Sequence, residues 1–215
     1  MERKVVLTAD GSSTIQWPDG ETYHSKHGAL QESLHVFIDA GLRFLSDRRE
    51  LKVFELGFGT GLNALLAAEY ASQTHIHVAY TSIEAFPLTN EWEALNYRVS
   101  HPALFSALHK ASWGLQQEIS PDFTLEKHHT TLVDFSFPEN HFDVVFWDAF
   151  SPRSQPDLWT ESAFERVFAS MKSGGLLTTY CAQGQVRRNM KAAGLVVEKI
   201  PGPPGKREMM RAFKP

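Results

Sequence analysis

Cysteine is almost absent from this sequence of 215 residues, in which Cys181 is the single thiol. One cysteine excludes an intramolecular disulfide and a zinc site built from several cysteines, and at the end of an apolar run it is typical of a small buried side chain. No apolar run approaches the roughly 20 residues that a membrane-spanning helix requires. The start, MERKVVLTADGSS, has neither an apolar core nor a small-residue cleavage site, so it does not indicate a signal peptide. These absences predict a cytoplasmic protein without a membrane partner.

The composition that is present is ordinary, but the charge is unevenly distributed. Hydrophobic residues make up 42% and charged residues 21% of the chain, which favours one folded domain over disorder. The net charge is −4, yet the segment from Arg187 to Pro215 has eight basic and two acidic residues, a net +6 that leaves −10 for the rest. Such a segment fits either a solvated face or a polyanion-binding surface. The total charge does not exclude a nucleic acid, because phosphate contacts need only a local patch.

The order of apolar patterns predicts an α/β fold. Residues 4–17 alternate around a turn at Ala9–Gly11 and lead into a second turn at Pro18–Gly20, and residues 29–45 have helical spacing. From Leu51 onward strands alternate with helices, which is typical of a mostly parallel sheet covered on both faces. We therefore expect an extension over residues 1–50 and a main domain over 51–215. The last two strands should be antiparallel, because a parallel crossover needs about a dozen residues and PGPPGK is shorter. The expected strands cover 51–56, 77–84, a pair within 123–135 with its turn near Lys127, 142–150, 176–181, 195–200 and 208–213. The expected helices cover 62–71, 87–97, 102–112, 160–171 and 183–193, with Thr160 as an N-cap.

A glycine-rich turn, Glu55–Gly61, lies directly between a predicted strand and a predicted helix. Ligands bind open α/β sheets at this end of the strands, and glycine lets the backbone turn sharply and approach a ligand closely. The spacing departs from the dinucleotide motif, because Leu62 stands where the third glycine belongs, and no phosphate-loop lysine follows. Glu55 would repel a pyrophosphate but suits a cationic sulfonium. The turn thus favours S-adenosyl-L-methionine (SAM) as ligand, against a merely structural turn.

Two further acidic residues end predicted strands near this turn. Glu84 ends the second strand, where a carboxylate can accept hydrogen bonds from both ribose hydroxyls of the ligand; alone, it would equally fit a surface charge. Asp134 ends the third predicted strand segment and is expected to accept a hydrogen bond from the adenine amino group, with a capping role as the alternative.

Asp148 follows the most apolar strand, FDVVFWDAF, and precedes a proline turn. A carboxylate there can accept an N–H hydrogen bond from an amine, orient its lone pair and offset the positive charge that develops during methyl transfer. Capping of the loop is the alternative role. Four aromatic residues are candidates for a wall against a nucleobase, although each alone is also typical of core: Tyr23, Trp147, Phe150 and Trp159. His75 and His77 share a strand face but have no third ligand in view, so no metal site is predicted.

The segments FELGFGTGLNALL, SIEAFPL and WDAFSPRSQPDLW resemble the tRNA 5-methylaminomethyl-2-thiouridine methyltransferases, the MnmC-type methyltransferase domain. YHSKHGALQES before the first helix and GKREM near the end are also similar, so the resemblance covers nearly the whole chain. It implies a Rossmann-like class I SAM-dependent methyltransferase fold with a seven-stranded sheet whose last strand is antiparallel. The implied reaction is N-methylation of the aminomethyl group on the wobble uridine of certain tRNAs, bound through the anticodon loop. The chain resembles the stand-alone form, which implies no FAD and a separate enzyme that supplies the aminomethyl precursor; no oligomeric state is implied.

The resemblance also assigns residues. Asp148 would face the amine, and the basic terminal segment would meet anticodon-stem phosphates. The cofactor residues are expected to be Glu55, Gly57, Phe58, Gly59, Thr60, Gly61, Asn63, Glu84, Ala85, Asp134 and Phe135. The substrate residues are expected to be Tyr23, Lys26, His27, Glu32, Ser33, Phe150, Ser151, Pro152, Lys206 and Arg207.

Two other functions fit the same motifs. One is a SAM-dependent N-methyltransferase or an aminopropyltransferase that acts on a small amine, which would need no polyanion-binding surface. The other is a SAM-binding partner module without catalysis, against which the presence of both Glu84 and Asp148 argues.

Overall fold

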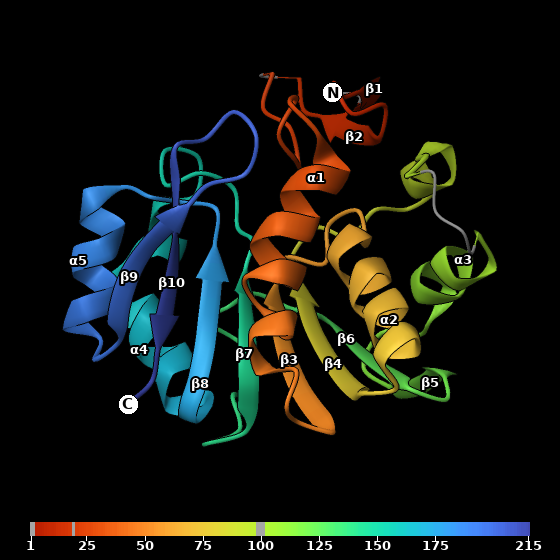
Figure 1. The fold of residues 1–215 in the computed structure, drawn as a ribbon. Helices are drawn as coiled ribbons and strands as arrows, with labels where there is room; N and C mark the ends of the chain where they lie inside the picture. Colours follow the sequence, from red (N-terminus) through yellow and green to blue (C-terminus); the bar gives the residue numbers. More distant parts are fainter. Residues whose placement is uncertain (1–2, 19, 98–101) are drawn as a thin grey trace.

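A computed structural model describes residues 3–18, 20–97 and 102–215, and its centre is a mostly parallel eight-stranded sheet (Figure 1). The strand order is β5-β6-β4-β3-β7-β8-β10-β9, and β10 is antiparallel to both of its neighbours. This confirms the α/β fold with an antiparallel last strand. The strands are β3 Glu50–Leu56, β4 His77–Glu84, β5 Gln116–Ser120, β6 Phe123–His129, β7 Phe142–Trp147, β8 Met171–Thr179, β9 Val196–Pro201 and β10 Glu208–Phe213.

The expectation of seven strands, with a strand pair inside residues 123–135, is wrong. Residues 123–129 form the single strand β6, which pairs in parallel with β4, while the additional strand β5 precedes it and pairs antiparallel along the outer edge. The reason lies in Lys127, which looks like a turn residue in sequence but is only 1% exposed. Its ammonium donates to the carbonyls of Leu108 and His109, 2.8 and 2.9 Å away, so a strand can carry a buried lysine here.

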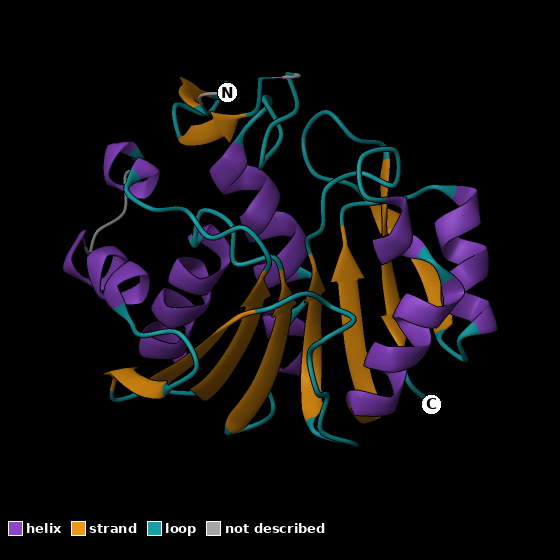
Figure 2. Cartoon of the chain, turned by 180° about the vertical axis from the view of Figure 1, so that it is seen from behind, coloured by secondary structure: helices purple, strands orange, loops and turns teal. Residues whose placement is uncertain are grey.

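Helices cover both faces of the sheet because its inner strands alternate apolar side chains between two cores (Figures 1 and 2). Val53 and Phe146 point toward the face with α1, α2 and α3, whereas Phe54 and Val145 point toward the face with α4 and α5. Thr160 caps α4 as predicted, since its hydroxyl accepts from the Ala163 N–H. The helices are α1 Ala29–Ser33, α2 Leu62–Thr74, α3 Pro102–Lys110, α4 Glu161–Ser170 and α5 Gly184–Ala192.

The extension before β3 forms the predicted hairpin, β1 Lys4–Leu7 and β2 Ser13–Gln16, and then a helix that packs on the sheet. Of the second predicted turn, Asp19 lies outside the described residues. The single helix expected over 29–45 is interrupted: α1 continues as a π-helix over Leu34–Asp39, and a 3-10 turn follows over Leu42–Leu45. Gly41 marks the break, because a Cβ at this position would lie 2.2 Å from the Phe37 carbonyl oxygen.

The helix expected over 87–97 is a 3-10 turn at Glu91–Ala94. The hairpin lies above the carboxyl ends of the parallel strands, at the top of Figure 1. In the described part of the chain, no helix combines the length and hydropathy of a membrane span. The division of the chain at residue 50 stays a prediction.

Candidate functional site

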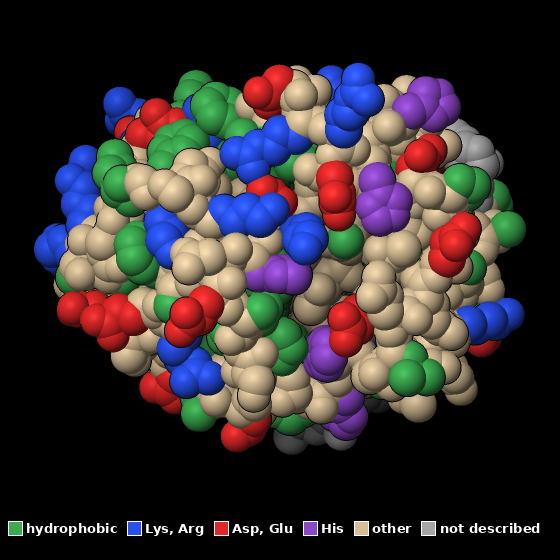
Figure 3. Space-filling view, turned by 90° about the horizontal axis from the view of Figure 1, so that it is seen from below, with side chains coloured by type: hydrophobic (Ala, Val, Ile, Leu, Met, Phe, Trp, Pro, Cys, Tyr) green, Lys and Arg blue, Asp and Glu red, His purple; other side chains and the backbone are tan. Residues whose placement is uncertain are grey.

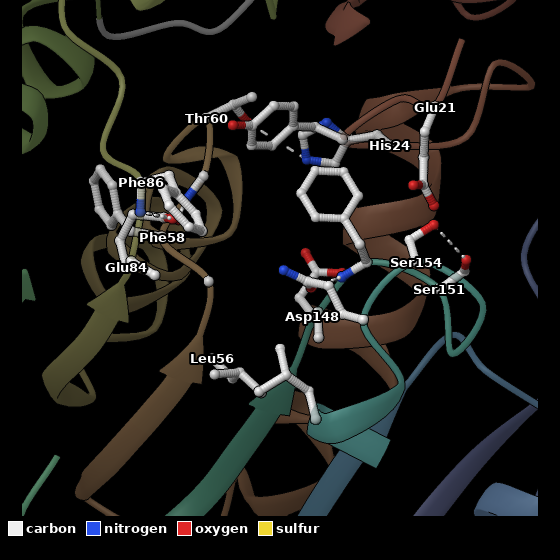
Figure 4. A pocket seen from close by; sticks show the side chains of 18 of the residues that line it. Glu21, His24, Leu56, Phe58, Thr60, Glu84, Phe86, Asp148, Ser151 and Ser154 are labelled. Atoms are coloured by element: carbon white, nitrogen blue, oxygen red, sulfur yellow. Dashed lines mark hydrogen bonds between the residues drawn. The ribbon is translucent and has the colours of Figure 1, made fainter. Parts of the chain in front are cut away.

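A cavity of about 640 Å³ opens at the carboxyl ends of β3, β4, β7 and β8. Its walls come from the hairpin extension, the glycine turn, the loop after β7 and the connection between β9 and β10. Figure 4 shows Glu84 and Phe58 on one side of the opening, Glu21, Ser151 and Ser154 on the other, and Asp148 between them. The volume lies within the range of about 300–1,000 Å³ that is usual for small-molecule sites.

The glycine turn has the backbone shape that the sequence predicted. Gly57, Gly59 and Gly61 have φ values of 93°, 49° and 72°, a region that favours glycine. A Cβ on Gly57 would lie 3.2 Å from the Asp148 carbonyl oxygen, and one on Gly59 would lie 3.0 Å from the Tyr23 ring. The turn therefore needs glycine both for its conformation and because the neighbouring walls approach so closely.

Glu84 is joined to this turn. One carboxylate oxygen accepts from the Gly59 N–H at 2.8 Å, and the other accepts from the Phe86 N–H at 2.8 Å. Each oxygen keeps a second lone pair, so the carboxylate can still accept from hydroxyl groups of a ligand in the cavity.

A buried network lies beneath the turn and ends at Asp148. The Asn63 side-chain amide donates to Glu55 at 3.1 Å and to Asp148 at 2.8 Å, and the Ser82 hydroxyl donates to Glu55 at 2.7 Å. Glu55 is 0% exposed, and burial raises its pKa to about 8. Burial, with the charge of Glu32 as a further cause, raises the pKa of Asp148 to about 7. Asn63 therefore orients a carboxyl group that is ready to exchange a proton near neutral pH.

The pKa of Glu55 makes stability depend on pH. The pKa of Glu55 in the folded protein lies above its ordinary value of 4.5, so the protonated side chain stabilises the fold. This stabilisation is complete below pH 4.5 and is lost as the pH rises through about 8. Glutamine mimics the protonated form, so Glu55→Gln should match the wild type near about pH 5 and become relatively more stable by about pH 8. Urea unfolding at several pH values measures this. A difference that stays constant with pH would contradict it.

The cavity brings together most of the predicted site residues. Asp148, Gly57, Gly59 and Glu84 lie on its wall. The other predicted residues on the wall are Tyr23, Glu32, Phe58, Thr60, Asn63, Ala85, Phe150, Ser151 and Lys206. Those that do not line it are Lys26, His27, Ser33, Glu55, Gly61, Asp134, Phe135, Pro152 and Arg207.

Asp134 is placed away from the cavity because β6 ends at His129, not at residue 134. A local turn binds it instead: the Thr131 hydroxyl donates to the Asp134 carboxylate at 2.6 Å and accepts from its N–H at 3.2 Å. Phe135 packs against Phe54 in the core. From this segment Thr130, Thr131 and Leu132 reach the cavity.

Two other predicted residues that do not line the cavity pack against neighbouring parts of the protein. Ser33 is fully buried in α1, and a Cβ on Gly205 would lie 2.4 Å from the His27 ring, so His27 contacts the connection between β9 and β10. Trp147 and Trp159 belong to the α4–α5 core and not to an aromatic wall. The Trp159 indole N–H donates to the Phe150 carbonyl at 2.8 Å and so positions the loop after β7.

The wall residues that the sequence analysis missed include Trp17, Glu21 and Tyr180. The Trp17 ring stacks on Tyr23 with centroids 6.2 Å apart, and Tyr23 meets Phe150 edge to face at 5.0 Å. The sequence feature that could have identified Trp17 is its position directly before the Pro18–Gly20 turn, with Tyr23 shortly after the turn. Trp17 was interpreted only as the end of a strand. Trp17, Tyr23 and Phe150 form an aromatic wall that joins the extension to the loop after β7.

Known proteins share this architecture. A family model described as S-adenosyl-L-methionine-dependent methyltransferase matches residues 119–215. The crystal structure of MNMC2 from Aquifex aeolicus superimposes with a TM-score of 0.85 at 25% identity, covering 99% of this chain and 70% of that one. A putative SAM-dependent methyltransferase from Listeria monocytogenes, with a TM-score of 0.52 at 12% identity, covers 86% of this chain and 98% of its own and shares the fold.

Two curated relatives are the tRNA 5-methylaminomethyl-2-thiouridine biosynthesis bifunctional proteins MnmC of Actinobacillus pleuropneumoniae and Methylobacillus flagellatus. Both are 30% identical, over 220 and 212 residues, which is 91% and 89% of this chain. The chain spans about a third of their length, 32% in each case. The fold and the glycine-lined cavity thus define a SAM-dependent methyltransferase of class I. Within this class, the chain is similar to the MnmC-type methyltransferase domains of these relatives.

Proposed function

We propose that the protein transfers the methyl group of SAM to the amino nitrogen of 5-aminomethyluridine, with or without 2-thiolation, at the wobble position of tRNA. The observation that carries this proposal is the position of Asp148, between the glycine turn and the aromatic wall of one cavity. The names of the curated relatives support the substrate class. The proposed reaction consumes an aminomethyl group, so another active site must produce it.

The residues around the glycine turn fit SAM. Gly57 and Gly59 present their backbone to the cavity, and Glu84 offers acceptors for two ribose hydroxyls. When bound, SAM supplies an electrophilic methyl group on a sulfonium. Methyl transfer to nitrogen is not a redox step, so FAD has no part in the proposed reaction.

Asp148 is proposed to act on the acceptor amine. A primary alkylammonium must lose a proton before the nitrogen has a lone pair that can attack, and a carboxylate with a pKa of about 7 can take that proton near neutral pH. The same side chain then accepts an N–H hydrogen bond and orients the lone pair. The buried Asn63 and Glu55 act through Asp148 as positioning residues, because Asn63 bridges the two carboxyl groups.

The aromatic wall of Trp17, Tyr23 and Phe150 is proposed to receive the uridine base. Bases of single-stranded RNA loops are commonly read by stacking on aromatic side chains, and turning a base out of an anticodon loop is cheap because it is already unpaired. Arg3 lies 4.4 Å above the Trp17 ring and pairs with Glu91 at 3.3 Å, which helps to hold the outer ring of this wall.

The basic terminal segment is proposed to meet tRNA phosphates through α5 and Arg207. Figure 3 shows the molecule from below, the side away from the hairpin, and there the Lys and Arg side chains on the half that holds α5 and β8–β10 in Figure 1 are interspersed with Asp and Glu. Three members of the segment bind carboxylates within the protein instead: Lys199 pairs with Glu208, Lys206 with Glu32 and Arg211 with Glu198, each at 2.7 Å. The exposed Arg207 is therefore favoured over Lys206 as a residue that binds phosphate.

Arg207→Glu should weaken tRNA binding and flatten its dependence on salt by about one unit in the slope of log K against log salt, because one phosphate contact is lost. SAM binding should not change, since Arg207 does not line the cavity. Filter binding of tRNA over a range of salt concentrations measures the slope. Lys110→Glu, on α3 far from the basic segment in sequence, is the matched control, and an unchanged slope in Arg207→Glu would remove this residue from the interface.

The proposed function is tested by mass spectrometry of wobble nucleosides. The protein is incubated with SAM and tRNA that bears 5-aminomethyluridine, and a mass increase of one CH₂ on that nucleoside alone is expected. Methylation or aminopropylation of free small amines, with tRNA left unmodified, would favour the small-amine enzyme instead. Binding of SAM without transfer to either acceptor would favour a non-catalytic module.

A further inference from the structure

One carboxylate on the cavity wall, that of Glu32, has no part in the methyl transfer as described so far. Glu32, on α1, has a side chain only 9% exposed. One of its oxygens accepts from the Ser25 N–H at 2.7 Å, and the other pairs with the Lys206 ammonium at 2.7 Å. Glu32, Lys206 and Asp148 all line the same cavity, and the Glu32 charge is strong enough there to raise the pKa of Asp148.

An aromatic ring completes the surroundings of this ammonium. Lys206 Nζ lies 3.9 Å from the centroid of the Tyr180 ring, well within the range of cation–π attraction. The Tyr180 hydroxyl donates to the Ala149 carbonyl at 2.8 Å, which fixes the ring next to the backbone of Asp148. A carboxylate on one side and an aromatic face on the other form the usual surroundings of a bound organic ammonium group.

Resting on the proposed function, we propose that Glu32 and Tyr180 form a subsite for a primary alkylammonium beside Asp148, held by Lys206 in this structure and taken by the protonated substrate amine during the reaction. Lys206 lies on the connection between β9 and β10, so its flexible side chain can leave Glu32 for solvent. The exchange replaces one cation by another and leaves the buried Glu32 charge paired, which avoids the cost of an uncompensated carboxylate.

The chemistry in this subsite balances. The ammonium gives one proton to the Asp148 carboxylate and becomes a neutral amine. Its lone pair forms the new C–N bond while the S–CH₃ bond breaks, and that electron pair stays on sulfur as a thioether. The product is a secondary ammonium, which Glu32 and Tyr180 bind as they bound the primary one. The subsite thus selects a cationic acceptor over a neutral or an anionic one.

The subsite is tested without methyl transfer by calorimetry of the wild-type chain saturated with S-adenosylhomocysteine. Benzylammonium should bind at least about tenfold more tightly than the neutral benzyl alcohol, because hydrogen bonds to charged partners are the stronger ones. Equal binding of the two probes would overturn the subsite. Since this experiment requires no tRNA, it separates failure of the subsite from failure of the proposed function.

Two variants extend the test to the reaction. Glu32→Gln should raise the KM for aminomethyluridine tRNA about tenfold with little change in SAM binding, whereas Lys206→Met should leave that KM unchanged or lower it, because a competing cation is removed. If the pair were only a structural contact between α1 and the β9–β10 connection, both variants would raise KM alike. That result, with normal activity in the wild type, would overturn the subsite alone.

Discussion

Asp148→Asn is expected to lower kcat for methyl transfer by about 10²- to 10⁴-fold, the usual contribution of a positioned general acid or base. Asparagine keeps the size of the side chain and can still accept from the Asn63 amide, so the loop after β7 should keep its position. What is lost is the negative charge and the ability to take a proton from the amine. Single-turnover kinetics with aminomethyluridine tRNA measure the loss, and calorimetry shows whether SAM binding is retained.

Asp39→Asn is the matched control for this substitution. It removes one carboxylate that lies outside the cavity, where Arg43 pairs with it, so kcat should stay at the wild-type value. Full activity in Asp148→Asn would show that the amine is deprotonated and oriented by another group, and it would remove Asp148 from the mechanism.

Glu84→Ala is expected to raise the dissociation constant of SAM by about 10- to 100-fold, because hydrogen bonds to a charged partner contribute about 1.5–3 kcal/mol each. Two effects combine in this variant. The Gly59 and Phe86 N–H groups lose the carboxylate that holds the glycine turn against β4, and the ligand loses the proposed acceptor for its ribose. Calorimetry with SAM and with S-adenosylhomocysteine should show the same loss for both, since they share the ribose.

Glu84→Gln separates the two effects. Its amide oxygen can accept from only one of the two backbone N–H groups, so an intermediate loss is expected. Glu118→Ala, on the outer strand β5, removes a carboxylate far from the turn and should leave binding unchanged. Normal affinity in Glu84→Ala would contradict a role for Glu84 in binding the ribose and would leave the glycine turn as the main contact.

The parts of the fold that follow local rules could be predicted from sequence. The bounds of β4 were predicted to the residue, because its apolar run is bounded by polar residues at both ends. The antiparallel last pair followed from a short connection alone. The glycine turn followed from spacing, since three residues with positive φ need glycine whatever surrounds them.

The errors arise where distant residues decide the outcome. Lys127 lies in a strand because the carbonyls that end α3 accept from it, and these are 18 and 19 residues away. Asp134 was predicted to lie in the site because its strand was assumed to continue as far as residue 134. Instead, the Asp134 N–H donates to the hydroxyl of Thr131, three residues earlier, and the chain forms a turn. Trp17 and Tyr180 reach the cavity through tertiary packing, which neither periodicity nor a motif encodes.

The hairpin extension lies directly on the glycine turn, with Tyr23 against Gly59 and the His24 ring 3.5 Å from the Thr60 hydroxyl. In the proposed function, the methyl donor and the acceptor are therefore bound by different segments of the chain, which meet at this contact. Changes within residues 17–25 can reshape which acceptor is admitted while the sheet continues to bind the donor. A family built in this way can diversify its substrates by altering one short segment near the start of the chain.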